Sequence, residues 1–275
     1  MSDSAPGDED AMHTRTLALY GQGRVAEALM LAWQTAAGHP NSPLAQYTYA
    51  SLLRESGRDR DALAVVDQTL RLSPASPDAL VLRGDLQRSL SGARAAEADY
   101  LQALRLQPDH ALAVHNLAVG RLRMGTTTKA VRGLLDATRL DPTLAPLALG
   151  NIALALTRVL RWATAAVVLL ASALIVVGAL RDDGVSTALP RVVAALLTVP
   201  LLVAIAWTVR TVPGPTLRAV LGSARLLVVR LLFLGAAAIV GVAVVAGATG
   251  IAGVAGPLLL FAVVGLTVLG WMTGA

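Results

Sequence analysis

Residues 77–110 read PDALVLRGDLQRSLSGARAAEADYLQALRLQPDH, and the pattern of this stretch returns along the first half of the chain. Proline recurs every 34 residues, at Pro40, Pro74, Pro108 and Pro142. Windows aligned on these prolines all have alanine at position 20, namely Ala28, Ala62, Ala96 and Ala130. A fixed period of about 20–50 residues indicates an array of stacked supersecondary units. We therefore predict four repeats, at residues 9–42, 43–76, 77–110 and 111–144.

The windows resemble the tetratricopeptide repeat, which has small residues at positions 8, 20 and 27, a large residue at 24 and proline at 32. The third window matches this pattern throughout, with Gly84, Ala96, Tyr100, Ala103 and Pro108. The resemblance covers residues 9–142, about half the chain. It departs from the pattern at position 7, usually leucine, where the first and third windows have Arg15 and Arg83. It also departs at position 11 of the fourth window, which is Arg121.

The resemblance implies two antiparallel helices per repeat, stacked into an all-α solenoid. Glycine recurs near position 15, at Gly23, Gly57, Gly92 and Gly125, where the turn between the helices needs a left-handed residue. Proline at position 32 would follow the end of the second helix, because it has no N–H to donate. Residues 1–8 are acidic and polar, and we predict a disordered tail there.

The second half of the chain has the composition of a membrane domain. Residues 162–180 and 192–209 have no charged side chain, and neither do the 45 residues 231–275, which suffice for two spans of roughly 20 residues. A turn at 248–250 would divide the last stretch. We predict four spans, near residues 162–180, 192–209, 231–248 and 251–272. Residues 145–161 would form a capping helix that connects the repeats rigidly to the first span.

Charge predicts how the spans are oriented. Residues 1–150 carry 15 basic and 16 acidic side chains, whereas residues 151–275 carry eight arginines and two aspartates. Arginines precede the first span and fill the segment between the second and third spans, and the positive-inside rule places both of these segments in the cytoplasm. In the loop between the first two spans, Arg181 and Arg191 are offset by Asp182 and Asp183. We therefore predict a multi-pass protein of the plasma or inner membrane with both termini cytoplasmic. Residues 216–230 would form an interfacial helix or an early start of the third span.

The sequence argues against several classes of function. The chain has no cysteine, and its four histidines have no metal-binding spacing, so we expect neither a metal nor a cofactor. No phosphate-binding loop or hydrolase motif occurs, and we predict that the protein is not an enzyme. The repeat half is nearly neutral, which disfavours nucleic-acid binding. No Asp, Glu, Lys or His lies inside a predicted span, which argues against a coupled transporter.

The resemblance also implies a ligand surface. In tetratricopeptide proteins, positions 2, 5, 9 and 12 of the first helices line a concave groove. The groove residues that we select here are Tyr47, Ser51, Arg54, Asp85, Arg88 and His115. Arg54 and Arg88 share position 12 in successive repeats, and two neighbouring guanidinium groups suit a carboxylate-bearing peptide. Alternatively, these arginines pair internally with Asp85 or Glu55.

These observations lead to a functional hypothesis with one alternative. The leading interpretation is a membrane-anchored scaffold or adaptor whose cytoplasmic repeats recruit a protein or peptide partner. Its other partners would be the bilayer and membrane subunits or further copies of the chain. The alternative is a channel, or an accessory subunit of a transport or secretion complex, that is regulated by its repeats.

Overall fold

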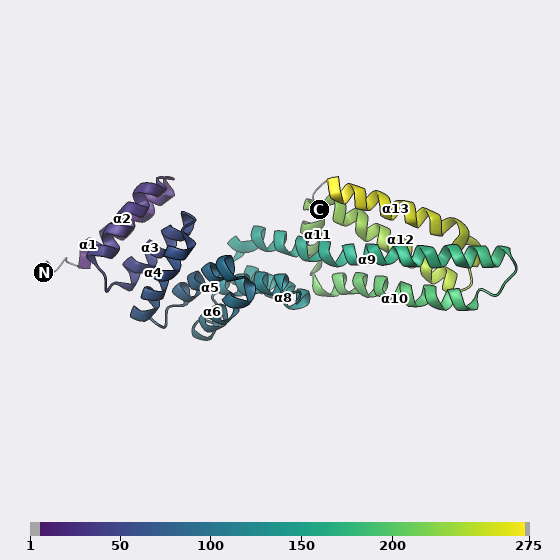
Figure 1. The fold of residues 1–275 in the computed structure, drawn as a ribbon, viewed down its shortest axis with the longest axis horizontal. Helices are drawn as coiled ribbons and strands as arrows, with labels where there is room; N and C mark the ends of the chain where they lie inside the picture. Colours follow the sequence, from purple (N-terminus) through teal and green to yellow (C-terminus); the bar gives the residue numbers. More distant parts are fainter. Residues whose placement is uncertain (1–5, 273–275) are drawn as a thin grey trace. The chain divides into compact units, whose positions relative to one another are not determined.

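The computed structural model describes residues 6–272, which form helices and no strand, as the sequence predicts (Figure 1). The chain divides into two compact units, residues 1–148 and 149–275. Most of the predicted tail, residues 1–5, lies outside the described residues. Residues 6–8 of that tail belong to the first turn of helix α1.

The first unit consists of four TPR-like helical hairpins. The first helices of the hairpins are α1 (Pro6–Gly21), α3 (Pro43–Glu55), α5 (Pro77–Ser91) and α7 (Ala111–Arg123). The second helices are α2 (Val25–Gly38), α4 (Asp59–Leu72), α6 (Ala93–Leu106) and α8 (Thr127–Leu140). The second helices all have 14 residues, and their first residues are spaced by 34. Each helix packs on the next one along the chain, so every repeat buries its apolar side on its neighbours.

Local chemistry explains where these helices begin and end. The Oγ atoms of Ser42 and Ser76 each accept a hydrogen bond from the backbone N–H of the residue three positions later in the chain. Pro43 and Pro77 occupy the first helical positions. Nδ1 of His110 takes the same role for α7. The prolines of the 34-residue series each stand two residues beyond the end of a second helix.

Glycines make the turns within the hairpins. Gly23, Gly57, Gly92 and Gly125 have φ values of 76°, 74°, 93° and 87°, in the left-handed region that glycine adopts without strain. The third turn differs in detail because α5 has 15 residues where α3 and α7 have 13. Gly92 alone therefore separates α5 from α6.

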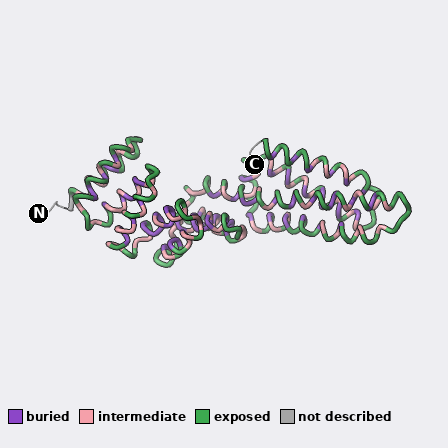
Figure 2. The backbone as a smooth tube through the Cα atoms, in the orientation of Figure 1, coloured by how far each residue is buried: buried purple, intermediate pink, exposed green. Residues whose placement is uncertain are grey.

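The core of the repeats forms where small residues meet large ones. Buried residues recur along every helix of the repeats (Figure 2). The four alanines at position 20 are completely buried, and Tyr100 is 1% exposed. A Cβ atom at Gly84 would lie 2.6 Å from Cε1 of Tyr100, so only glycine lets α5 approach the tyrosine ring this closely. This contact joins positions 8 and 24 of the third repeat.

The second unit is a bundle of apolar helices. The main helices are α9 (Ala145–Asp182), α10 (Ala188–Thr211), α12 (Arg225–Val245) and α13 (Ala252–Met272), with the short helix α11 (Gly214–Ser223) between α10 and α12. Each of the four main helices is long and apolar enough to cross a membrane. The predicted connecting helix 145–161 and the predicted first span are both parts of α9.

Two predicted boundaries in this unit differ from the structure. The third apolar helix runs from Arg225 to Val245, whereas the predicted span covers 231–248, so the helix begins before the uncharged stretch. Residues 214–223 form the separate helix α11, so the basic segment contains both a short helix and an early start of the third apolar helix. A short 3-10 helix, Thr249–Ile251, follows the turn between α12 and α13.

Glycines also set the distances between the apolar helices. A Cβ atom at Gly178 of α9 would lie 2.6 Å from Cα of Gly253 in α13, and one at Gly256 would lie 2.9 Å from the carbonyl oxygen of Ala171. Close backbone contact through small residues is typical of helix pairs in lipid. Outside these contacts, large apolar side chains such as Leu196, Ile239 and Phe261 are 67%, 72% and 77% exposed.

Candidate functional site: a polar concavity on the repeats

Three neighbouring first helices carry the predicted groove residues. Tyr47, Ser51 and Arg54 stand on α3, Asp85 and Arg88 on α5, and His115 on α7. Helix α5 contacts both α3 and α7. The structure therefore brings the three helices side by side, and the contacts of each residue show what the surface can do.

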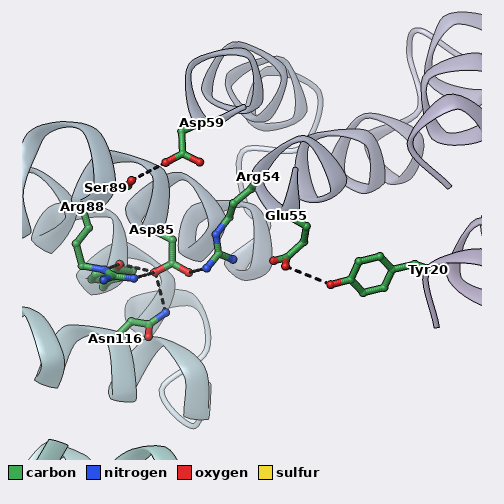
Figure 3. A network of polar contacts seen from close by, with 9 residues as sticks. Tyr20, Arg54, Glu55, Asp59, Asp85, Arg88, Ser89 and Asn116 are labelled. Carbon is green, nitrogen blue, oxygen red and sulfur yellow. Dashed lines mark hydrogen bonds and ion pairs between the residues drawn. The ribbon is translucent and has the colours of Figure 1, made fainter. Parts of the chain in front are cut away.

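Asp85 is the centre of a network of polar contacts (Figure 3). Its carboxylate is buried, and Oδ1 accepts hydrogen bonds from the hydroxyl of Tyr100 at 2.7 Å and from Nδ2 of Asn116 at 2.9 Å. Nη2 of Arg88 lies 3.3 Å from Oδ1, and Nη2 of Arg54 lies 3.2 Å from Oδ2. Both carboxylate oxygens are thus engaged inside the protein.

This network bears on both interpretations of the arginine pair. Arg54 and Arg88 do lie in adjacent repeats, and both form an internal ion pair with Asp85. Their side chains remain 37% and 22% exposed. A guanidinium group has five N–H donors, so a contact with Asp85 orients each arginine without using all its donors.

The remaining predicted groove residues have different environments. His115 is 5% exposed, and its Nδ1 has no hydrogen-bond partner within residues 6–272. Burial lowers the pKa of His115, while the nearby charge of Asp85 acts in the opposite direction. Tyr47 is partly buried, and burial raises the pKa of its hydroxyl. Ser51 is also partly buried.

An open concavity of about 520 Å³ lies beside the Asp85 network. Its lining residues are Arg54, Glu55, Asp59, Asp85, Leu86, Arg88, Ser89 and Arg123. Three of the six predicted groove residues (Arg54, Asp85 and Arg88) belong to this lining, and Tyr47, Ser51 and His115 do not. The concavity lies at the C-terminal ends of α3, α5 and α7, where basic side chains also face the negative ends of the helix dipoles.

Sequence reasoning missed several residues of this site. Glu55, Ser89 and Arg123 share position 13 in three successive repeats, so the 34-residue period could have identified them. Asn116 and Tyr100 lie outside the positions expected to face a ligand, and only their contacts with Asp85 reveal them. They make the carboxylate part of the core rather than part of a free ligand surface.

Two further contacts hold the rim of the concavity. The hydroxyl of Tyr20 donates to Oε2 of Glu55 at 3.2 Å, and the Glu55 charge raises the pKa of that hydroxyl. Oγ of Ser89 donates to Oδ2 of Asp59 at 2.5 Å. Arg123 is exposed, and the structure shows no ion pair for it within the described part of the chain. Arg123 is therefore the lining cation most accessible to a partner.

The lining of the concavity combines one buried carboxylate with three arginines. In residues 6–272 no group of three or more His, Asp or Glu side chains is placed to hold a metal ion. The only buried carboxylate in the lining is Asp85, whose Oδ1 accepts hydrogen bonds and whose Oδ2 forms an ion pair with Arg54. The arrangement can hold oriented guanidinium groups against an incoming carboxylate, which is a binding role.

Comparison with known proteins adds a likeness of fold. No family model matches the chain, and no curated protein matches it either. TTC0263, a thermophilic TPR protein of Thermus thermophilus, is 20% identical with a TM-score of 0.49, over 54% of this chain and 80% of that one. MamA from Desulfovibrio magneticus RS-1 is 20% identical with a TM-score of 0.47, over 57% and 86% of the two chains. PilF of Pseudomonas aeruginosa is 18% identical with a TM-score of 0.49, over 55% and 68%. Similarities of this size concern the arrangement of helices alone and carry no information about partners.

Proposed function

We propose that this protein is a membrane-anchored scaffold whose repeats recruit a protein or peptide partner through the concavity beside Asp85. The apolar helices of residues 149–272 would anchor it in the plasma or inner membrane, with both termini in the cytoplasm. The observation that supports recruitment most directly is the pair of arginines, Arg54 and Arg88, that Asp85 holds in adjacent repeats.

The chemistry of the concavity favours a partner that presents a carboxylate. Asp85 orients Arg54 and Arg88 and offsets one of their two charges, and Arg123 contributes a further cation. An Arg–carboxylate contact of this kind can be bidentate, which adds specificity as well as affinity. Glu55 and Asp59 line the same concavity, so basic groups of the partner would find acceptors beside the carboxylate site.

The surface of the second unit supports the membrane anchor. Its helices expose large apolar side chains along their length, including Leu169, Leu202 and Val264 at 59%, 44% and 61%. Continuous apolar surface of this kind is unfavourable in water and is solvated by lipid chains. In the most apolar segment of each of the four main helices, only 28–44% of the segment is buried, as expected for helices that face lipid on one side.

Crosslinking in native membranes, followed by affinity purification of the full chain, tests the recruitment proposal. The test variants are Arg123→Gln and Arg54→Gln, and the matched control is Arg105→Gln, an exposed arginine on α6. We expect the test variants to lose about tenfold or more of the crosslinked partner, because each removes a charged hydrogen bond of roughly 1.5–3 kcal/mol. The control should retain it. Equal recovery of the partner with all three variants would contradict the proposed concavity.

A further inference from the structure

Arginines of the helix bundle collect at one of its ends. At the other end, Nη2 of Arg191 donates to the carbonyl oxygen of Val245 at 2.5 Å, and Arg181 lies against Gly250. The beginning of α10 and the end of α9 therefore meet the turn after α12. It follows that the beginning of α12 and the end of α10 share the opposite end with the middle of α9. The arginines at this opposite end are Arg161, Arg210, Arg218, Arg225 and Arg230.

Arg230 is unusual among these arginines because it is buried. The residue is 4% exposed, and its Nη1 atom has no hydrogen-bond partner among residues 6–272. Arg161, another cation, stands at the same end of the bundle, and its charge acts on the Arg230 guanidinium group. A buried cation beside a second cation is strongly unfavourable unless an anion compensates both.

The second unit provides no carboxylate for this purpose. Its two acidic residues lie at the far end of α9, where Asp182 is the last residue of the helix and Asp183 follows it. An anion that compensates the charge of Arg230 would therefore come from outside this unit. A guanidinium group has the planar, forked geometry that matches phosphate oxygens, and two of them together suit a doubly contacted phosphate.

The position of the two arginines indicates where this phosphate comes from. Arg161 directly precedes the uncharged stretch 162–180, and Arg230 directly precedes the uncharged stretch that begins at Leu231. Both cations thus stand at the boundary between charged and apolar sequence, the depth at which phospholipid headgroups lie. Trp162, next to Arg161, is 77% exposed, and tryptophan favours this layer.

We propose that Arg230 and Arg161 bind the phosphate of an anionic phospholipid headgroup at this end of the bundle. Arg161 is exposed and would make the first contact, and the phosphate would then satisfy Nη1 of Arg230. This inference rests on the proposed membrane anchor, and it adds a specific lipid site to a bundle that otherwise contacts lipid through apolar side chains. Basic groups between helices at the cytoplasmic surface are a known mode of headgroup binding.

Native mass spectrometry of the full chain, released from nanodiscs with equal phosphatidylglycerol and phosphatidylcholine, tests the proposal. We expect the unmodified chain to retain phosphatidylglycerol preferentially, and Arg230→Gln and Arg161→Gln each to reduce that retention about fivefold or more. Arg230→Lys should keep part of it, because an ammonium group still binds phosphate. Arg210→Gln removes the same charge from an exposed position and should change retention by less than about twofold.

Two results would overturn the lipid site. One is unchanged phosphatidylglycerol retention in Arg161→Gln, a variant at an exposed position that should fold normally. The other is protection of the unmodified chain against thermal unfolding by inorganic phosphate in lipid-free detergent, because this would identify a free anion as the ligand. Alkaline carbonate extraction separates the two proposals. If the chain stays in the membrane fraction while retention is unchanged, only the lipid site fails, whereas extraction of the chain would remove the membrane anchor as well.

Discussion

At the scale of single residues, the repeats depend on a few close contacts. Gly84 lets α5 pack on the ring of Tyr100, whose hydroxyl then reaches Asp85. Arg83 departs from the usual leucine at position 7, and the structure gives the reason. Its Nε and Nη2 atoms donate to both carboxylate oxygens of Asp99, at 3.0 and 2.5 Å, and its Nη1 lies 3.4 Å from Asp67 of the preceding repeat. The hydrogen bonds with Asp99 raise the pKa of Arg83 despite its partial burial.

The close contact at Gly84 predicts a strong effect of one methyl group. Gly84→Ala would place Cβ 2.6 Å from Cε1 of Tyr100, in a buried position where neither helix can yield easily. We expect the free energy of unfolding to fall by about 1–3 kcal/mol. Urea unfolding of the full chain in mild detergent, followed by circular dichroism, measures this change. Gly120→Ala is the matched control, since its Cβ would meet its nearest neighbour at 3.9 Å and stability should be unchanged or about 1 kcal/mol higher.

His115 should make the stability of the repeats depend on pH. Because burial lowers its pKa, the folded chain keeps His115 neutral at pH values where the unfolded chain protonates it. This stability contribution is fully present above about pH 6.5 and is lost as the pH falls from there through the lowered pKa. Between pH 7 and 5 we expect the unmodified chain to lose more stability than His115→Gln, by up to about 1.4 kcal/mol per pH unit. Urea unfolding of the two proteins at each pH measures this difference. An equal pH dependence of stability in the unmodified chain and in His115→Gln would contradict this role of His115.

At the scale of the elements, the same helix caps and turn glycines recur in successive repeats. Serine or histidine caps each of α3, α5 and α7, and a glycine with positive φ joins the helices of every hairpin. These devices act within a few residues of the chain. Their positions therefore follow the 34-residue period, except where α5 is longer and moves its turn by one residue to Gly92.

The turn glycines give a prediction at this scale. Gly57 has a φ of 74°, and nothing lies within 4 Å of a Cβ atom built on it. Gly57→Ala would therefore be unfavourable only because alanine is strained in the left-handed conformation. We expect the free energy of unfolding to fall by roughly 1–2 kcal/mol. Gly21→Ala, at the end of α1, has the same open surroundings without a positive φ and should change stability by less than about 0.5 kcal/mol. A similar loss in both variants would mean that backbone strain is not the cause.

At the scale of the whole molecule, the proposed membrane anchor makes the orientation of the chain a testable question. The arginine distribution predicts that the turn between α9 and α10 lies outside the cytoplasm and that α11 lies inside it. Chain orientation decides whether the repeats can recruit a cytoplasmic partner at all.

The absence of cysteine from the sequence allows a direct measurement of this orientation. Single cysteines at exposed positions, Ser186→Cys before α10 and Ser223→Cys at the end of α11, can be labelled with a membrane-impermeant maleimide. We expect Ser186→Cys to react in intact cells and Ser223→Cys to react only after permeabilisation. The unmodified chain should not react. The reverse pattern would place the repeats outside the cytoplasm and contradict the proposed function.

The repeats, their turns and the apolar helices could be predicted from the sequence, because each depends on features that are local in the chain. Period, glycine position and runs of uncharged residues all act over one helix or one hairpin. The contacts of the arginines could not be predicted in this way. Arg54 and Arg88 could have faced a ligand freely, and the buried carboxylate of Asp85 instead binds both. Asp85 also accepts hydrogen bonds from Tyr100, which is 15 residues away in the sequence, and from Asn116, which is 31 residues away. An arginine side chain is long and flexible, so several partners are within its reach. Which of them it contacts depends on burial and on distances between separate helices, and a local sequence pattern contains neither.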